Sequence, residues 1–270
     1  MNAKEQELEK VFDRLTSYNL ESRKVFETML DFIIFCTTIS DETDEKFPIE
    51  IQDKIAYKDK LLKDFSDKDK EAFSQMITLL GEATTDEATG KPAYYDALGD
   101  LFMAKVSSNN SKGRNDQYFT PQYICDLMVQ IQSPTSLQDG QAICDPTCGS
   151  SRFLLSMAKV NPNLFFCGSD IDHLCVKMSV VNLTLNGLEG EIVWGNPLTF
   201  EGWKAYQIKR RGIYGVPMIQ IKHAENSIHF GKKPKQEAEG DKQKAIDNKQ
   251  ETESIKPKTY SSQQLTLNFD

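Results

Sequence analysis

The sequence lacks the features of a membrane protein or a secreted protein. No apolar run among its 270 residues approaches the ~18 residues that a membrane-spanning helix needs. The first ten residues, MNAKEQELEK, are polar and have no apolar centre of the kind found in signal peptides. We therefore expect a cytoplasmic protein that makes no membrane contact.

The sequence also lacks the cysteine spacings of a zinc site or of a secreted disulfide framework. It has no CxxC pair, and most of its six cysteines lie in apolar runs. They are Cys36, Cys125, Cys144, Cys148, Cys167 and Cys175. We expect reduced thiols and no bound metal, with a zinc site as the alternative.

An excess of positive charge is absent as well. The chain has 32 Lys and Arg against 40 Asp and Glu, a net charge of −8. Tight DNA binding needs a basic face, so we expect any DNA contact to involve a partner. We interpret one basic and aromatic cluster as a solvated edge rather than a nucleic-acid groove. Its members are Trp203, Lys204, Tyr206, Lys209, Arg210, Arg211, Tyr214 and Lys222.

Residues 1–106 are predicted to form an all-helical N-terminal region. Apolar residues recur there at helical spacing, and one helix is expected to begin at the cap Ser66 and to end at Gly81. The stripes are Leu8, Val11, Phe12 and Leu15; Phe26, Met29, Leu30, Ile33 and Ile34; Phe73, Met76, Ile77 and Leu80; and Leu98, Leu101, Phe102 and Val106. We expect these side chains to form core.

Residues 107–230 are predicted to form a Rossmann-like α/β domain with an incomplete sheet. After a polar linker at 107–116, Thr120-Pro121 has the form of a helix start. Short apolar strands then alternate with helices, which is typical of a parallel sheet covered on both faces. We expect strands at 142–144, 164–167, 191–194 and 217–221, and helices at 151–159 and 172–186.

The stretch ICDPTCGSSRFLL, residues 143–155, predicts a ligand-binding turn between a strand and a helix. Asp145 ends the strand, and Asp170 follows the next strand, roughly 20 residues beyond the turn, where an acid binds ribose hydroxyls. The pattern G-x-G-x-x-G is absent, and Asp145 would repel phosphate but suit an ammonium group. Ribose and ammonium together indicate S-adenosylmethionine. A structural aspartate that caps a helix is the alternative.

Four segments, in order, resemble adenine-specific DNA methyltransferases, especially the modification subunits of type I restriction–modification systems. DPTCGSSRFLL is similar to motif I, D-P-x-C-G-S-G-x-F, and GSDID (168–172) to the motif II acid. DALGDLF (96–102) is similar to D-x-L-G-x-x-Y in the helical lead-in of that family. DQYFTPQYI (116–124) is similar to Q-[FY]-F-T-P.

The resemblance implies a set of residues that bind S-adenosylmethionine. Aromatic and Thr-Pro side chains would flank its methionine part, the turn would receive its amino-acid moiety, and Asp170 would hold its ribose with Ile171 against its adenine. The full set is Tyr118, Phe119, Thr120, Pro121, Asp145, Pro146, Cys148, Gly149, Ser150, Asp170, Ile171 and Asn196. Ser151 stands where the family usually has a second glycine. A serine adds a side chain at this position and disfavours a positive φ there.

The sequence lacks the catalytic tetrad [DNS]-P-P-[FYW], which in that family follows the fourth strand and holds the flipped adenine. The weak catalytic candidates are Asn196 and Pro197, but Leu198 replaces the second proline. We interpret Gly195–Leu198 as the motif III loop G-[DN]-x-L, which contacts the adenine of the cofactor. His223 and His229 are expected to be polar surface residues.

Residues 231–270 are predicted to be a disordered tail with a terminal docking peptide. The segment 231–258 is charged and nearly free of large apolar residues. QLTLNF, residues 264–269, is similar to the peptide with which bacterial proteins bind the replicative sliding clamp. Gln264, Leu265, Leu267 and Phe269 would make that contact. The alternative is a strand on the chain's own sheet edge.

Three functions follow from these patterns. The first is a DNA adenine methyltransferase that binds S-adenosylmethionine and needs a partner to complete its base pocket. The missing tetrad argues against activity of this chain alone, and the resemblance implies DNA and a specificity subunit as partners. The second is a non-catalytic, DNA-associated adaptor recruited through the sliding clamp. The third is a methyltransferase for a non-DNA acceptor.

Overall fold

The structure is a computed structural model that describes residues 3–16, 21–38, 54–107, 118–132, 137–211 and 215–228. Residues Met1–Gly231 form one compact unit, and all of the described residues belong to it. The predicted tail, including Gln264–Phe269, lies outside them, so its disorder stays a prediction. No helix in the described ranges is both long and apolar enough to cross a membrane.

Helices dominate the N-terminal part, as the apolar spacing predicted. They are α1 (Ala3–Thr16), α2 (Ser22–Thr37), α4 (Lys54–Leu62), α5 (Asp67–Ala83) and α6 (Ala97–Phe102), which continues as a π-helical turn, Met103–Ser107. Ser66 caps α5 in a capping box with Asp69. The predicted end at Gly81 is wrong, because α5 continues to Ala83 and buries that side chain.

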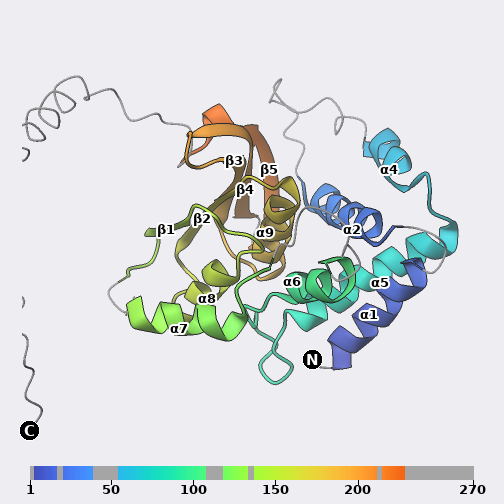
Figure 1. The fold of residues 1–270 in the computed structure, drawn as a ribbon, viewed down its shortest axis with the longest axis horizontal. Helices are drawn as coiled ribbons and strands as arrows, with labels where there is room; N and C mark the ends of the chain where they lie inside the picture. The colour runs from blue at the N-terminus through green and yellow to red at the C-terminus, as the bar shows by residue number, and fades with distance from the viewer. Residues whose placement is uncertain are drawn as a thin grey trace, which may run out of the picture. The chain divides into compact units, whose positions relative to one another are not determined.

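The C-terminal part is a five-stranded mixed sheet with the order β1-β2-β3-β4-β5. The strands are β1 (Ala142–Asp145), β2 (Phe165–Asp170), β3 (Gly190–Asn196), β4 (Glu201–Arg211) and β5 (Val216–His223). β1, β2 and β3 are parallel, whereas β4 and β5 are antiparallel to their neighbours. Together with the helices between the parallel strands, this arrangement confirms the α/β, Rossmann-like fold class (Figure 1).

Three helices accompany the sheet: α7 (Gln122–Gln132), α8 (Arg152–Val160) and α9 (His173–Leu185). α7 packs on α8, and α9 packs on both the sheet and α2. Because α9 is covered on both sides, it buries side chains around its whole circumference, from Leu174 to Thr184. One apolar core joins the N-terminal helices to the sheet, and the boundary at residue 106 stays a prediction.

Most of the basic and aromatic cluster that we interpreted as a solvated edge lies in β4, between β3 and β5, so this part of it is not an edge of the sheet. Ala205, Tyr206 and Ile208 are buried, whereas Lys209–Arg211 are exposed. The strand predicted at 217–221 exists, but it is the fifth strand rather than the fourth. His223 is exposed at the end of β5, and His229 lies outside the described residues.

Candidate functional site

The turn between β1 and α8 is closed by its own backbone and by β2. The amide of Thr147 donates to Asp145 at 3.1 Å, and the amide of Cys148 donates to the carbonyl of Ser169 at 3.0 Å. Gly149 has a φ of +54°, and a Cβ on it would lie 3.2 Å from the ring of Phe119. A side chain at Gly149 would therefore be both strained and crowded.

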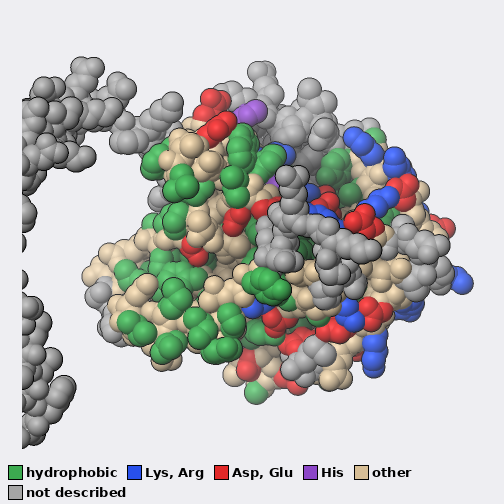
Figure 2. Space-filling model, in the orientation of Figure 1, with side chains coloured by type: hydrophobic (Ala, Val, Ile, Leu, Met, Phe, Trp, Pro, Cys, Tyr) green, Lys and Arg blue, Asp and Glu red, His purple; other side chains and the backbone are tan. Residues whose placement is uncertain are grey.

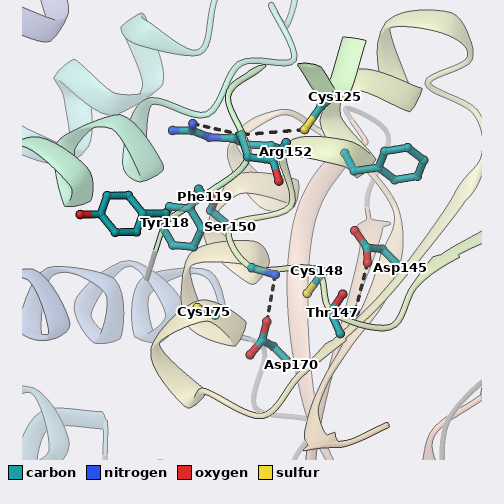
Figure 3. A pocket seen from close by; sticks show the side chains of 13 residues that line it. Tyr118, Phe119, Cys125, Asp145, Thr147, Cys148, Ser150, Arg152, Asp170 and Cys175 are labelled. Carbon is teal, nitrogen blue, oxygen red and sulfur yellow. Dashed lines mark hydrogen bonds between the residues drawn. The ribbon is translucent and has the colours of Figure 1, made fainter. Parts of the chain in front are cut away.

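This turn forms one wall of a pocket of about 250 Å³ (Figure 3). Eight of the predicted cofactor residues line it: Tyr118, Phe119, Thr120, Asp145, Cys148, Gly149, Ser150 and Asp170. Five further lining residues were not predicted: Cys125, Thr147, Arg152, Phe153 and Cys175. The structure thus brings motif I, the motif II acid and the Tyr-Phe-Thr segment together around one cavity.

Two aspartates give the pocket its electrostatic character. The carboxylate of Asp170 accepts the amide of Gly149 through Oδ2 at 3.0 Å and the amide of Asp172 through Oδ1 at 2.9 Å. Burial raises the pKa of Asp145 and of Asp170, and the charge of Asp170 raises the pKa of Asp145 further. Within the described ranges, neither carboxylate forms an ion pair with a Lys or Arg. The pocket is suited to a ligand that carries positive charge and hydroxyl donors.

The other predicted cofactor residues do not line the pocket. Ile171 is exposed after β2, and its carbonyl accepts the indole N–H of Trp194 at 3.1 Å. Asn196 ends β3, and its side-chain oxygen accepts the amide of Leu198 at 3.0 Å. These residues follow the carboxyl ends of neighbouring parallel strands, the edge where ligands of such sheets bind. Pro121 and Pro146 also do not line the cavity.

A buried acid that the sequence did not single out holds the turn in place. Asp96 is 1% exposed. Its Oδ2 accepts from Arg152 Nε at 2.7 Å and from Ser150 Oγ at 2.6 Å. Its Oδ1 accepts from Asn182 Nδ2 and from the amide of Gly99, both at 2.7 Å. One carboxylate therefore joins the start of α6 to the turn, to α8 and to α9. The signal in the sequence is the segment DALGDLF, which begins at Asp96 and resembles the lead-in segment of the family, but the resemblance gave Asp96 no role.

Arg152 extends this connection to the other wall of the pocket. Its second ion pair is with Asp100, and its Nη1 donates to the carbonyl of Thr120 at 3.3 Å. The guanidinium also lies 5.8 Å from the ring centre of Phe119. Arg152 thus links motif I to the Tyr-Phe-Thr-Pro segment, which follows the lead-in helix α6.

Ser151 has the strained conformation that its position predicts. Its φ is +72°, in the left-handed region, and it precedes α8 without a side-chain capping bond. Its hydroxyl is buried and has no hydrogen-bond partner among the described residues. The family glycine would carry neither the left-handed strain nor the buried hydroxyl.

A second cluster, which the sequence did not indicate, lies after β2. The ring of His173 stacks on Trp194 at 4.2 Å, and its Nε2 lies 2.8 Å from the hydroxyl of Tyr206. Burial lowers the pKa of His173 to about 3. The imidazole is therefore neutral near pH 7, and this cluster fixes the end of β2 rather than supplying an acid.

The cysteines of the pocket are thiols rather than thiolates. All six cysteines of the chain are free. Burial raises the pKa of Cys148 and of Cys175, and Cys148 Sγ lies 3.3 Å from the hydroxyl of Ser179. Both side chains pack as small apolar groups and are poor nucleophiles. Among the described residues, no three His, Cys, Asp or Glu side chains group as metal ligands would.

Two solved structures share parts of this fold. One is a class I S-adenosylmethionine-dependent methyltransferase from Listeria monocytogenes, with 14% identity, a TM-score of 0.40, and coverage of 73% of this chain and 55% of that one. The other is a type I restriction–modification system methyltransferase subunit from Streptococcus thermophilus, with 19% identity, a TM-score of 0.32, and coverage of 66% and 36%. Both TM-scores are low, so the family assignment depends on the sequence matches.

Sequence matches identify the family. The methylase subunit of the type I restriction enzyme MjaIX from Methanocaldococcus jannaschii is 24% identical over 156 residues, which are 55% of this chain and 26% of that subunit. The chain thus spans about a quarter of the length of this relative. The model of the N-6 DNA methylase family matches residues 93–252, more than half of the chain. The chain therefore belongs to the N-6 DNA methylase family.

Proposed function

We propose that this chain is the S-adenosylmethionine-binding part of a DNA adenine methyltransferase of the restriction–modification type. The observation that carries the proposal is the pair Asp145 and Asp170, two half-buried carboxylates without a basic partner in the described ranges, on either side of the turn at Gly149. Membership of the N-6 DNA methylase family supports DNA as the acceptor over other acceptors.

The pocket residues fit S-adenosylmethionine by their chemistry. Asp145 would attract the ammonium group, and the carboxylate of Asp170 would accept hydrogen bonds from ribose hydroxyls. Gly149 lets the backbone approach the ligand closely, and the aromatic rings of Tyr118 and Phe119 offer an apolar surface to the methionine part. When bound, S-adenosylmethionine would supply an activated methyl group.

The catalytic tetrad of such an enzyme is not among the 270 residues. The oxygen of Asn196 is used within its own turn, and Leu198, where a proline would be needed, is 90% exposed. Both features support a loop rather than a base-binding motif at 195–198. We propose that this chain alone transfers no methyl group, and that DNA and a specificity subunit are engaged through partners.

The second candidate function is a DNA-associated adaptor without catalysis. The missing tetrad and the hexapeptide QLTLNF favour it. It predicts that deletion of Gln264–Asp270 abolishes binding to purified sliding clamp in surface plasmon resonance, whereas binding of S-adenosylmethionine persists. Clamp binding that survives the deletion, or that is absent from the full chain, would remove the adaptor hypothesis.

Titration calorimetry with S-adenosylmethionine tests the proposed function. The full chain should bind it, and Asp145→Asn should weaken binding about tenfold or more, because a charge-assisted contact is lost. Asp139→Asn is the matched control, because this exposed aspartate bonds Asn161 and Asn163 and does not line the pocket. Absence of binding at millimolar ligand, or equal effects of the two substitutions, would contradict the proposal.

The same titration should depend on pH in a defined direction. A cationic ligand needs ionised carboxylates, and burial raises the pKa of both Asp145 and Asp170. As the pH is lowered, the affinity should therefore begin to decline at a higher pH than it would if both carboxylates had the pKa of an exposed aspartate. Asp145→Asn should flatten this decline, since one of the two titrating groups is removed.

A further inference from the structure

Helix α9 carries two polar side chains in the interior of the protein. Figure 2 shows charged side chains gathered over the N-terminal helices, whereas α9 is covered by the sheet and by α2 and is buried around its whole circumference. Ser179 and Asn182 are each 0% exposed, and their spacing of three residues places them on one face of the helix. Burying a hydroxyl or an amide costs free energy unless the group is hydrogen-bonded. The partners of these two side chains therefore indicate what this face does.

Both side chains bind the backbone of the turn between β1 and α8. Ser179 Oγ donates to the carbonyl of Gly149 at 2.7 Å, and Asn182 Nδ2 donates to the carbonyl of Ser150 at 2.8 Å. Neither Ser179 nor Asn182 lines the pocket. These two consecutive carbonyl oxygens are therefore turned toward the interior of the protein rather than toward the ligand site. Because each peptide group is planar, the direction of the amide that follows each carbonyl is fixed as well.

Strand β2 holds the first half of the same turn. The hydroxyl of Ser169 donates to the carbonyl of Pro146 at 2.9 Å, and the carbonyl of Ser169 accepts the amide of Cys148 at 3.0 Å. Asp170, the last residue of β2, accepts the amide of Gly149 at 3.0 Å. β2 thus fixes the backbone as far as that amide, and α9 fixes the two carbonyls that follow it.

The half of the turn that α9 holds is also the half with unusual backbone conformation. The φ angles are +54° at Gly149 and +72° at Ser151, and the second is strained because serine has a Cβ. A strained conformation persists only where the surrounding contacts impose it. Since the hydroxyl of Ser151 has no partner among the described residues, its own side chain supplies no such contact. The hydrogen bonds from α9 to the two preceding carbonyls do.

We propose that Ser179 and Asn182 are positioning residues for S-adenosylmethionine, which hold the turn at Gly149 and Ser150 in its binding conformation before the ligand arrives. The inference rests on the proposed function for the identity of the ligand. Neither residue touches the ligand, and each acts through the carbonyl that it binds. A turn that is already ordered loses less conformational entropy when a ligand binds, so both hydrogen bonds contribute to affinity.

The alternative is that the two side chains only stabilise the fold, and the same helix offers controls for that role. Thr184 Oγ1 donates to the carbonyl of Val180 at 2.7 Å, and Asn186 Nδ2 donates to the carbonyl of Asn182 at 2.9 Å. Thr184 and Asn186 are buried as well, but these hydrogen bonds are made to the backbone of α9 itself. Their loss should lower stability without releasing the turn.

Titration calorimetry of the full chain with S-adenosylmethionine tests the proposal. Ser179→Ala should weaken binding about fivefold or more, because the carbonyl of Gly149 loses its donor. Thr184→Val, which also removes one buried hydroxyl from α9, should bind as the unsubstituted chain does. Asn182→Ala and Asn186→Ala form a second pair with the same expectation, and the serine pair decides if Asn182→Ala does not fold. Unchanged affinity in Ser179→Ala, or equal losses in Ser179→Ala and Thr184→Val, would overturn the proposal.

Hydrogen exchange of the ligand-free chain separates this proposal from the proposed function. Amides of residues 146–152 should exchange about fivefold faster or more in Ser179→Ala, because the turn opens more often, and at the original rate in Thr184→Val. If S-adenosylmethionine binds but these amides exchange equally in both variants, the positioning proposal fails alone. If the ligand binds to none of the proteins, the proposed function fails, and the exchange rates alone decide whether α9 orders the turn.

Discussion

At the scale of residues, Ser150 and Ser151 are adjacent in the turn but have opposite effects on its stability. Ser150 donates its hydroxyl to buried Asp96 at 2.6 Å. Ser151 has a left-handed backbone and a buried hydroxyl without a partner in the part of the chain that the structure describes. Two neighbouring serines thus stabilise and destabilise the same turn, and the pair offers a matched test of what this departure from the family glycine does.

We expect Ser151→Gly to stabilise the protein by about 1 kcal/mol, because glycine adopts a positive φ without strain and removes a buried unsatisfied hydroxyl. The melting temperature should rise by roughly 2–4 °C. Ser150→Ala should lower it, because Asp96 loses a donor. Calorimetric melting of the three proteins measures the difference. A stability loss in Ser151→Gly would mean that the serine makes contacts that offset its strain.

The residues of the turn could be predicted from the sequence, but the role of Asp96 could not, although Asp96 begins the segment DALGDLF that resembles the family. Asp145, Gly149 and Asp170 are encoded by local patterns, a strand end followed by a small-residue turn or an acid. The role of Asp96 depends on Arg152 and Asn182, which are 56 and 86 positions away along the chain. That site arises only where Asp96 at the start of α6 meets Arg152 of α8 and Asn182 of α9, so the local segment does not show which groups Asp96 contacts.

At the scale of elements, the junction of α6, α8 and α9 determines where the turn sits. Asp96 caps α6 through the amide of Gly99, and the same carboxylate pairs with Arg152 at the start of α8. Arg152 also pairs with Asp100, whose side chain is 48% exposed. Asp96 and Asp100 both pair with the guanidinium of Arg152 but differ in burial. Substitutions at the two positions therefore compare the contribution of a buried ion pair with that of an ion pair that water screens.

Asp96→Asn should destabilise the chain by about 3 kcal/mol or more, because it leaves a buried guanidinium without its main counterion. Asp100→Asn, the control, should cost less than about 1 kcal/mol, since the exposed pair is screened by solvent. Urea unfolding followed by circular dichroism gives both values. Equal losses would show that Asp96 does not organise the junction, and a weaker affinity of Asp96→Asn for S-adenosylmethionine would show that it positions the pocket.

The strand elements illustrate where sequence patterns stop being informative. β1, β2 and β3 were predicted within a few residues, since each is a short apolar run before a turn. β4 was missed because its two faces pack on different neighbours. Ile208 belongs to the main core, whereas Ala205 packs with Val193 and Ala224 in a second cluster. Its apolar residues therefore follow no clean alternation, and the lysines and arginines around them suggested an exposed edge.

At the scale of the whole molecule, the strands that follow β3 extend the sheet on the side away from the pocket. After β3, the chain adds the antiparallel strands β4 and β5 on the far side from β1. Among the described residues, the pocket edge at β1 and β2 is thus flanked by further strands on one side only. Which edge of a sheet receives the next strand depends on long-range pairing, and the local periodicity of the sequence carries no information about that pairing.

This topology leads to a prediction about activity. Asn196 ends β3, and its side-chain oxygen closes its own turn by accepting the amide of Leu198, while Leu198 and Thr199 stand where the tetrad needs a proline and an aromatic residue. The purified chain should therefore transfer no labelled methyl group to adenine in DNA, and the Asn196→Ala variant should likewise transfer none. Transfer should arise only when a polypeptide with the tetrad is added, and it should then be lost in Asp145→Asn but retained in Asp139→Asn. Methylation by the chain alone that Asn196→Ala abolishes would instead identify 195–198 as a shortened catalytic motif.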